Sequence, residues 1–382
     1  MKISEFNLSY CLNAFDFTSD WKYTLTEIDR CFNTVREMSG FSSDKMTALG
    51  FWTSEFFLEL MRNPDNFRYL QEFLEKRNYY ISTVNAFPYG VFHNQPVKDK
   101  VYMPNWLSEK RVDFTMKAAE FLEKFLPDGG TGSISTLPGA YRRHIRDNNG
   151  ESLRLIARNL EKTAEYLAYL YEKTGKKIRL GIEMEPDCIW ETPDEFAGFY
   201  KKYLLPNRYS REYIGVCYDT CHQELIENEP GAGLDILERY EIPVVKIQLS
   251  AALQIQNGAK FADIKEFDEP VYLHQTRIFN KKNGAICETF KDIPELRSYS
   301  ADDVTLKCHF HLPLFWDSDN TSFRSARKEL LAVIRYIKAN PGFCRDLEIE
   351  TYTYSVLPDC VDFRSIGSAV SKEYNWVVKC LM

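Results

Sequence analysis

The sequence lacks the features that would place the chain in a membrane, outside the cell or on nucleic acid. No stretch approaches 18 uninterrupted apolar residues, so we predict no transmembrane helix. Residues 1–17 contain no continuous apolar run, so we expect no secretory signal. No basic run is present and the net charge is −7, which argues against a nucleic-acid partner.

Cysteine pairs with the spacing of a zinc or redox motif are also missing. The ten cysteines are scattered and include no CxxC pair. The one close pair, Cys217 and Cys221, is most simply explained as two packing thiols at the end of a strand. This usage is typical of reduced, buried thiols, and we therefore predict a cytoplasmic protein.

Short apolar segments alternate with long amphipathic segments along almost the whole chain. Strand–helix alternation of this kind predicts a parallel sheet covered by helices. About eight such units favour a closed α/β barrel, the (β/α)₈ TIM barrel. The predicted helices are 19–38, 54–77, 108–125, 151–175, 192–204 and 321–339, and all of them have apolar residues at a spacing of three to four.

Nine segments have strand character, one more than the barrel requires. The surplus strand is either "KIQLSAA" (246–252) or "KCHFHLP" (307–313), and the sequence leaves the choice open. Residues 251–303 interrupt the alternation and contain a predicted hairpin that turns at Lys282, Asn283 and Gly284. We expect one domain over 1–382, with 251–303 as a β-rich insertion after strand seven.

The late strands share a polar face. Apolar residues on one side of each strand must face the helices, so the polar residues on the other side should point into the barrel. Two inward glutamates alone would fit a solvated strand end equally well. Five strands with polar inward faces favour a divalent-metal site, because isolated charges are unfavourable to bury. The inward polar positions include Glu183, Glu185, Cys217, Asp219, Lys246, Gln248, Ser250, Lys307, His309, His311, Glu348, Glu350 and Tyr352.

The distribution of the six histidines supports a metal site. His222, His309 and His311 fall at the ends of late strands, and His274 lies in the predicted insertion. A hydrogen-bonded packing role is the simpler alternative for any single histidine, but the shared placement of three favours ligation. The side chains expected to meet at one ion of Mn, Zn or Mg are Glu183, Asp219, His222, His309 or His311, and Glu350.

This arrangement resembles the xylose isomerase-like TIM barrels, which include ketose epimerases and endonuclease IV-like enzymes. The resemblance implies that Glu183, Asp219, His222 and Glu350 match the ligands of strand five, strand six and the last strand. The strand-seven histidine of that pattern is missing. Gln248 or Ser250 stands there, and the histidines of "CHFHLP" lie further along the chain.

At finer grain the sequence is similar to the EboE-type metabolite traffic proteins. That resemblance implies an operon for secondary metabolism that handles a small metabolite, such as a prenylated cyclitol or a sugar derivative. It covers residues from about 84 to 358 through the segments "VNAFPYGVFH", "VKDKVYMPNW", "GSISTLPGAYR", "YLHQ", "HFHLPLF" and "LEIETYTYSVLP".

The leading hypothesis is a metal-dependent isomerase or epimerase of a sugar, cyclitol or related small polyol. Glu183 and Glu350 would act as an acid/base pair as well as ligands. Two alternatives remain open: a non-catalytic metabolite-binding or traffic protein, and a metal-dependent phosphoesterase of the endonuclease IV-like type. Candidates for contacts with substrate hydroxyls, each of which could instead be a barrel-interior hydrogen-bonding residue, are Glu185, Asn85, Lys246, Gln248 and His274.

Overall fold

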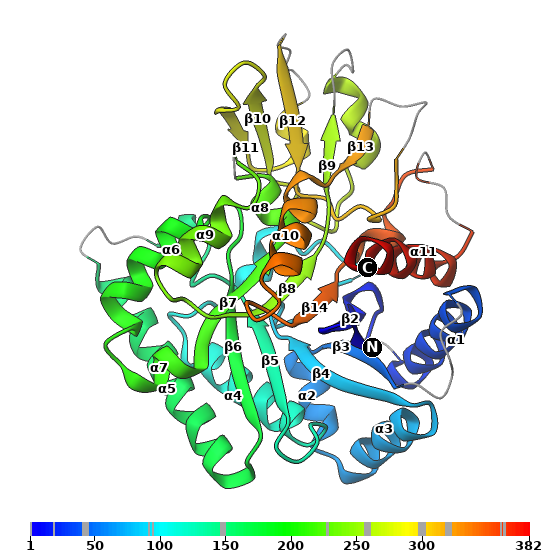
Figure 1. Ribbon diagram of the computed structural model, residues 1–382, viewed down its shortest axis with the longest axis vertical. Coiled ribbons are helices and arrows are strands. Elements are labelled where there is room, and N and C mark those ends of the chain that lie inside the picture. Colours follow the sequence, from blue (N-terminus) through cyan, green and yellow to red (C-terminus); the bar gives the residue numbers. More distant parts are fainter. Residues whose placement is uncertain are drawn as a thin grey trace.

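The computed structural model describes most of the chain. The described residues are 2–17, 20–39, 46–90, 92–93, 95–145, 150–226, 229–255, 261–296, 303–317, 323–359, 361 and 364–382. Within them, strands and helices alternate up to residue 249, and a group of further strands then precedes the last barrel strand (Figure 1).

Eight parallel strands close into a barrel, as the sequence predicted. Each strand pairs with its neighbours, and β2 pairs with both β14 and β3, so the described sheet has no break around the barrel. A short antiparallel strand, β1 (Lys2–Ile3), adds to β2 outside this ring. The barrel strands are β2 (Phe6–Cys11), β3 (Thr47–Trp52), β4 (Tyr79–Asn85), β5 (Thr131–Thr136), β6 (Lys177–Glu183), β7 (Ile214–Asp219), β8 (Val244–Leu249) and β14 (Asp346–Ile349).

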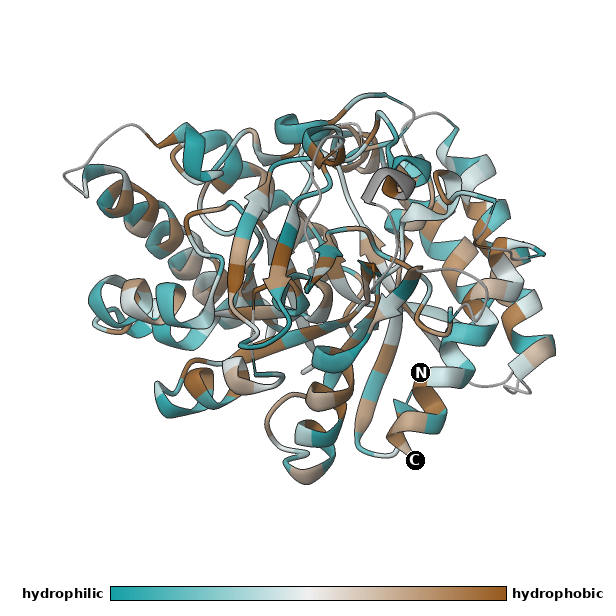
Figure 2. Ribbon diagram, turned by 90° about the horizontal axis from the view of Figure 1, so that it is seen from above, coloured by the Kyte–Doolittle hydropathy of each residue, from teal (hydrophilic) through white to brown (hydrophobic). Residues whose placement is uncertain are grey.

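Amphipathic helices surround the barrel. Their hydrophobic and hydrophilic bands are visible in Figure 2, where several strands also alternate between the two. No helix in the described ranges is long and apolar enough to cross a membrane. The helices are α1 (Trp21–Ser39), α2 (Glu55–Met61), α3 (Pro64–Lys76), α4 (Glu109–Glu123), α5 (Glu151–Thr174), α6 (Pro193–Phe199), α7 (Arg208–Tyr213), α8 (Thr220–Glu224), α9 (Ala232–Arg239), α10 (Lys328–Ala339) and α11 (Ile366–Leu381).

Two predicted helices differ from those observed. The segment 54–77 is divided into α2 and α3, because Asn63 caps a new helix that has Pro64 in its first turn. The helix predicted over 321–339 was wrong at its start. Phe323–Ala326 forms strand β13, and the helix begins only at Lys328. Thr192 and Glu195 form a capping box at the start of α6.

A second, antiparallel sheet lies beyond one end of the barrel (Figure 1). Its order is β11-β10-β12-β9-β13, and the predicted hairpin around Gly284 forms β10 and β11. The segment 307–313 therefore contains the surplus strand, and 246–252 contains the seventh barrel strand. The sheet extends from residue 252 to 326, beyond residue 303, where the predicted insertion ends. That the sheet and the barrel form one domain stays a prediction. Its strands are β9 (Ala252–Ile255), β10 (Thr276–Asn280), β11 (Ile286–Phe290), β12 (Val304–Cys308) and β13 (Phe323–Ala326).

A buried ion pair fills part of the barrel interior. Lys246 Nζ on β8 lies 2.6 Å from Glu348 Oε2 on β14 and donates to Ser135 Oγ at 3.0 Å. Burial alone would lower the pKa of Lys246, but the charge of Glu348 outweighs it and the pKa is raised. Gly50 makes room for this pair, because a Cβ there would lie 1.5 Å from Glu348 Oε1.

Candidate metal centre

Three carboxylates meet at the carboxyl ends of the barrel strands. Glu183 ends β6, Asp219 ends β7 and Glu350 follows β14, and all three are at most 3% exposed. One ligand oxygen of each lies within 4.8 Å of the others. Parallel strands end on the same rim of a barrel, which explains why residues so distant in sequence come together. The convergence expected of these three residues is what the structure shows.

The carboxylate cluster fits a cation. One oxygen each of Glu183 (Oε2), Asp219 (Oδ2) and Glu350 (Oε2) is buried and accepts no hydrogen bond from an amide, imidazole or hydroxyl group of the described residues. Burial raises the pKa of Glu350 well above its usual range, and the charges of Glu183 and Asp219 raise it further. Burial raises the pKa of Glu183 in the same way, with Asp219 adding to the shift and Lys246 opposing it. A divalent ion would relieve both the desolvation and the repulsion.

Asp219 differs from the two glutamates because it caps α8. Its Oδ1 accepts hydrogen bonds from the backbone N–H groups of Cys221 at 2.7 Å and His222 at 3.1 Å, and from Ser250 Oγ at 2.6 Å. Burial favours the neutral acid, but the charges of His222 and His311 and hydrogen bonds from the Glu350 carboxyl and Ser250 outweigh it, so the pKa of Asp219 is lowered. Asp219 is therefore the most readily ionised carboxyl of the cluster. In the absence of a cation, the raised pKa values of Glu183 and Glu350 favour their protonated forms.

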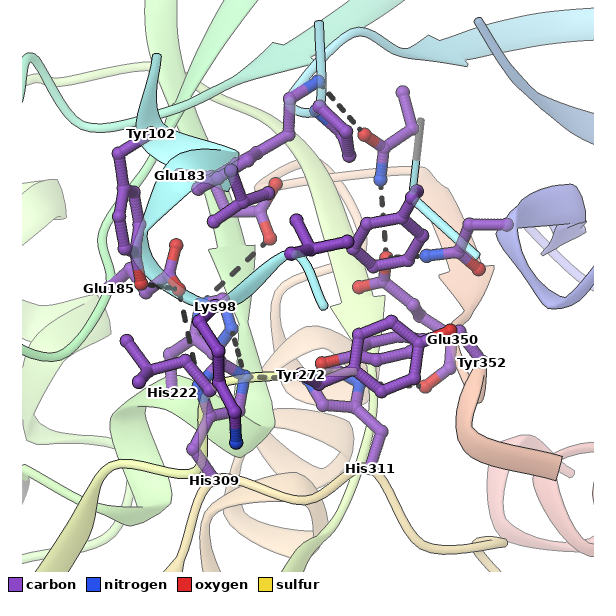
Figure 3. Close-up of a pocket in the computed structure, with 18 residues that line it drawn as sticks. Lys98, Tyr102, Glu183, Glu185, His222, Tyr272, His309, His311, Glu350 and Tyr352 are labelled. Atoms are coloured by element: carbon purple, nitrogen blue, oxygen red, sulfur yellow. Dashed lines mark hydrogen bonds and ion pairs between the residues drawn. The ribbon is translucent and has the colours of Figure 1, made fainter. Parts of the chain in front are cut away.

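Three histidines lie next to the carboxylates. His222 is on α8, and His309 and His311 follow β12 of the second sheet. His309 Nε2 lies 3.1 Å from His222 Nε2 and 3.2 Å from His311 Nε2, and Figure 3 shows the three rings together. Asp219, His222 and His311 form one group with ligand atoms within 4.8 Å. Of the two segments left open as the seventh barrel strand, 307–313 lies outside the barrel, and His309 and His311 reach the site from the second sheet.

Residues from several loops complete a pocket around these groups. The space between its lining atoms, including the part that is open to solvent, is about 560 Å³. Glu350 Oε1 accepts from Asn13 Nδ2 at 2.7 Å and Asn85 Nδ2 at 3.2 Å, and Tyr102 donates to Glu185 Oε1 at 2.7 Å. Much of the remaining wall is apolar or aromatic and includes Phe87, Phe92, Val97, Val101, Tyr272, Leu273 and Tyr352.

The predicted substrate-binding residues divide into two groups. Glu185 and Asn85 line the pocket. Lys246 is paired with Glu348 inside the barrel, and Gln248 Oε1 accepts from the Cys217 thiol at 3.0 Å. His274 is bonded to Glu269 and to the His309 carbonyl. These last three are not among the residues that line the pocket.

Tyr352, one of the expected inward positions, lines the pocket, but four further lining residues were not indicated by the sequence: Asn13, Lys98, Tyr102 and Tyr272. Asn13 and Lys98 lie in short 3-10 segments, η1 (Leu12–Ala14) and η2 (Lys98–Tyr102). Such segments have no periodicity that would indicate which way a side chain points. The only available signal was that Asn13 follows the first strand, as Asn85 ends the third.

No model of a protein family matches this sequence, and no curated protein is similar to it. Two solved structures are similar over nearly their whole length. D-psicose 3-epimerase from Clostridium cellulolyticum H10, solved with D-tagatose, has a TM-score of 0.55 and 8% identity, with 98% of this chain and 99% of that one covered. A xylose isomerase-like TIM barrel protein from Mycobacterium smegmatis, in complex with magnesium, has a TM-score of 0.50 and 12% identity, with 100% and 98% covered.

This chain has the xylose isomerase-like (β/α)₈ TIM-barrel fold. On this xylose isomerase-like barrel, the carboxylates and imidazoles gather at the carboxyl ends of the strands, where TIM-barrel enzymes have their active sites. At 8% and 12% identity the similarity establishes the fold alone. The chemistry must therefore be argued from the residues of this chain.

Proposed function

We propose that this protein is a metal-dependent isomerase or epimerase of a sugar, cyclitol or related small polyol. One observation carries the proposal: three buried carboxylates, each with an oxygen that no amide, imidazole or hydroxyl group of the described residues contacts, meet at the carboxyl ends of the barrel strands. Two of them, Glu183 and Glu350, line the pocket there. The structural similarity to D-psicose 3-epimerase supports the same class of substrate.

The proposed metal ligands are the carboxylates of Glu183, Asp219 and Glu350, completed by an imidazole of the adjacent histidine group. His222 and His311 are suited to this role, because their ligand atoms lie within 4.8 Å of that of Asp219. Carboxylate oxygens with imidazole accept Mn²⁺, Zn²⁺ or Mg²⁺. When bound, such an ion would supply Lewis-acid polarisation of adjacent substrate oxygens.

Proton transfer is assigned to Glu183 and Glu350. Both carboxyls have pKa values raised by burial and by neighbouring carboxylates, which favours the protonated form that a general acid needs. The Nδ2 groups of Asn13 and Asn85 fix Glu350 by donating to Oε1, which leaves Oε2 directed at the cluster. The carboxyl groups of Glu183 and Glu350 are therefore proposed to exchange protons with substrate carbon.

Other residues would bind the hydroxyls and exclude water. Glu185 and Asn85 face the pocket as candidate partners for substrate hydroxyls, and the aromatic wall formed by Phe92, Tyr272 and Tyr352 limits solvent access. Lys246, Gln248 and His274 are proposed to support the site indirectly. Lys246, paired with Glu348, would supply a positive charge inside the barrel near the cluster. Gln248 accepts a hydrogen bond from Cys217 in the barrel interior, and His274 is hydrogen-bonded to the carbonyl of His309.

The test is hydrogen exchange at carbon. Mn²⁺-loaded protein would be incubated in D₂O with ketoses, aldoses and inositols, and deuterium incorporation would be followed by NMR. We expect Glu183→Gln and Glu350→Gln to lower the rate by about 10²–10⁴-fold. Glu165→Gln, the same chemical change on an exposed part of α5, should leave the rate unchanged. No exchange with any polyol, despite metal binding, would refute the isomerase proposal.

A second candidate function is metabolite binding or traffic without turnover. Gln248 stands where the related barrels have a strand-seven ligand, and its amide oxygen is occupied by the Cys217 thiol. Tight binding of a polyol without exchange would favour this function. Release of phosphate from phosphoesters would instead favour an endonuclease IV-like phosphoesterase. The cytoplasmic location, which rests on the cysteine usage, belongs to this proposal too. So do the EboE-type assignment and the role in a secondary-metabolite operon, which rest on the sequence resemblance.

A further inference from the structure

A buried glutamate lies outside the pocket, on the last helix of the chain. That helix, α11, packs beside α1 in the ring of helices (Figure 1), yet Glu373 on it is 0% exposed. Glu373 is not among the residues that line the pocket. A carboxylate buried in this way must be compensated by hydrogen bonds or by a counter-charge, because it has lost its contacts with water. Its partners therefore show which parts of the molecule it holds.

Four hydrogen-bond donors surround this carboxylate. Oε1 accepts from the backbone N–H of Leu314 at 2.9 Å and from Thr351 Oγ1 at 2.7 Å. Oε2 accepts from the phenol groups of Tyr10 at 2.7 Å and Tyr354 at 2.6 Å. Burial raises the pKa of Glu373, and these four hydrogen bonds oppose that shift. Because an ionised carboxylate has about four acceptor positions, the four donors use its full capacity.

Through Oε1, Glu373 reaches the backbone segment that carries Glu350. Strand β14 ends at Ile349, and the N–H of Glu350 then donates to the Leu249 carbonyl at 3.1 Å. Thr351 follows directly and is 0% exposed. The hydrogen bond from its hydroxyl to Glu373 therefore fixes the chain at the residue after Glu350, where the barrel strand no longer does so.

The same oxygen also reaches the segment that carries His311. Leu314, whose N–H donates to Glu373, follows His311 in the same segment after β12. His311 Nδ1 donates to the Glu350 carbonyl at 3.1 Å, since a carbonyl can only accept. The His311 carbonyl in turn accepts from Thr353 Oγ1 at 2.5 Å. These two bonds join the segments to each other, and Glu373 joins both of them to α11.

We propose that Glu373 is a positioning residue of the metal centre, which holds Glu350 and His311 in place through the segments that carry them. This role rests on the proposed function, because it requires that Glu350 binds the ion. Hydrogen-bond partners that lie one step behind the ligands commonly change metal affinity by about 10–100-fold when they are removed. Since Glu373 does not line the pocket, it would act through Thr351 and Leu314 and not on the ion or the substrate.

The alternative is that Glu373 only fastens α11 to the barrel. In that case, loss of any of its four hydrogen bonds would lower the stability of the fold and leave metal affinity unchanged. A positioning role predicts a difference between the two oxygens. The bond from Thr351 to Oε1 acts on the residue next to Glu350, whereas the bond from Tyr10 to Oε2 reaches β2, which carries none of the proposed ligands.

The experiment is titration of Mn²⁺ into protein stripped by chelator, with free Mn²⁺ measured by electron paramagnetic resonance and stability measured by thermal melting. We expect Thr351→Val to weaken Mn²⁺ binding by about 10–100-fold. Tyr10→Phe removes one hydrogen bond from the same carboxylate, so it should also melt at a lower temperature but bind Mn²⁺ as tightly as wild type. Thr163→Val, the same chemical change at a buried threonine of α5, is the second control and should also keep wild-type affinity.

Glu373 itself is tested with two substitutions. Glutamine keeps one acceptor oxygen, which can face Leu314 and Thr351 while its amide group donates to the tyrosine hydroxyls. Glu373→Gln should therefore retain more Mn²⁺ affinity than Glu373→Leu, which has no acceptor. If Glu373→Leu fails to fold, the comparison of Thr351→Val with Tyr10→Phe decides the question.

Two results would overturn the positioning role. They are unchanged Mn²⁺ affinity in Thr351→Val, and an equal loss of affinity in Thr351→Val and Tyr10→Phe. Binding of Mn²⁺ without hydrogen exchange in any polyol would refute the isomerase function and leave the role of Glu373 intact. Wild-type protein that binds no Mn²⁺ would refute both.

Discussion

Removal of metal from the carboxylate cluster should lower the melting temperature by a predictable amount. An ion that binds only the folded chain adds about 2.7 kcal/mol at a hundredfold excess over its dissociation constant, and about 4.1 kcal/mol at a thousandfold excess. For 382 residues, an unfolding entropy of about 2.1 cal/mol/K per residue gives roughly 0.8 kcal/mol per degree. Chelation should therefore lower the melting temperature by about 3 °C in the first case and about 5 °C in the second.

The pH dependence of this effect follows from the raised pKa values of Glu183 and Glu350. A carboxyl whose pKa is raised in the folded chain contributes full stability below its unfolded pKa and loses it as the pH rises toward the folded value. Metal displaces these protons, so its stabilising effect should grow as the pH increases. Glu350→Gln should weaken the response to metal, and because it also removes repulsion, the metal-free variant should melt at or above the wild-type temperature.

The assay is scanning calorimetry of one preparation in excess chelator and after titration with Mn²⁺ or Zn²⁺, at pH 6 and pH 8. Glu165→Gln on the surface of α5 is the matched control for loss of one carboxylate. Superimposable melting curves with and without metal, together with a plain loss of stability in Glu350→Gln, would refute the reasoning. That pattern would indicate a satisfied polar interior that needs no cation.

Three further predictions concern the groups around the cluster. Burial raises the pKa of Glu185 to about 7. In urea unfolding under chelation, the stability of Glu185→Gln relative to wild type should therefore rise by about 3 kcal/mol between pH 4.5 and pH 8, and a constant difference would contradict this. Lys246→Met should lose about 3–5 kcal/mol, because Glu348 is left buried without its partner, and adding Glu348→Gln should recover part of the loss. Gly50→Ala should destabilise the fold by about 1–3 kcal/mol, since the new methyl group must displace Glu348. An unchanged urea midpoint in Lys246→Met or in Gly50→Ala would exclude a structural role for the Lys246–Glu348 pair.

Most of the barrel could be predicted from the sequence because its signals are local. Apolar segments of strand length, separated by amphipathic helices, indicate parallel strands wherever they occur. The period of two within each strand identified Glu183 and Asp219 as inward residues. The alternation in the last strand identified Glu350 in the same way. Both inferences need only the direction of a side chain along its own strand.

The remainder depended on contacts between distant segments. Strand β12 has the same alternation as a barrel strand, so its sequence did not show that it pairs with β9 and β10. His309 and His311 were expected among the ligands, but their place in a second sheet, outside the barrel, was not. For Lys246 the choice between a substrate contact and a role inside the barrel stayed open, because its partner, Glu348, lies on another strand. Asn13 and Tyr102 lie in irregular segments, where periodicity does not indicate orientation.

The most direct test of the central claim is a crystal soaked with Mn²⁺ and measured for anomalous scattering. We expect a strong peak among the carboxylates of Glu183, Asp219 and Glu350, with metal–oxygen distances of roughly 2.0–2.3 Å. A map in which manganese appears only at the molecular surface, with the three carboxylates arranged as they are without it, would exclude a metal site at this cluster.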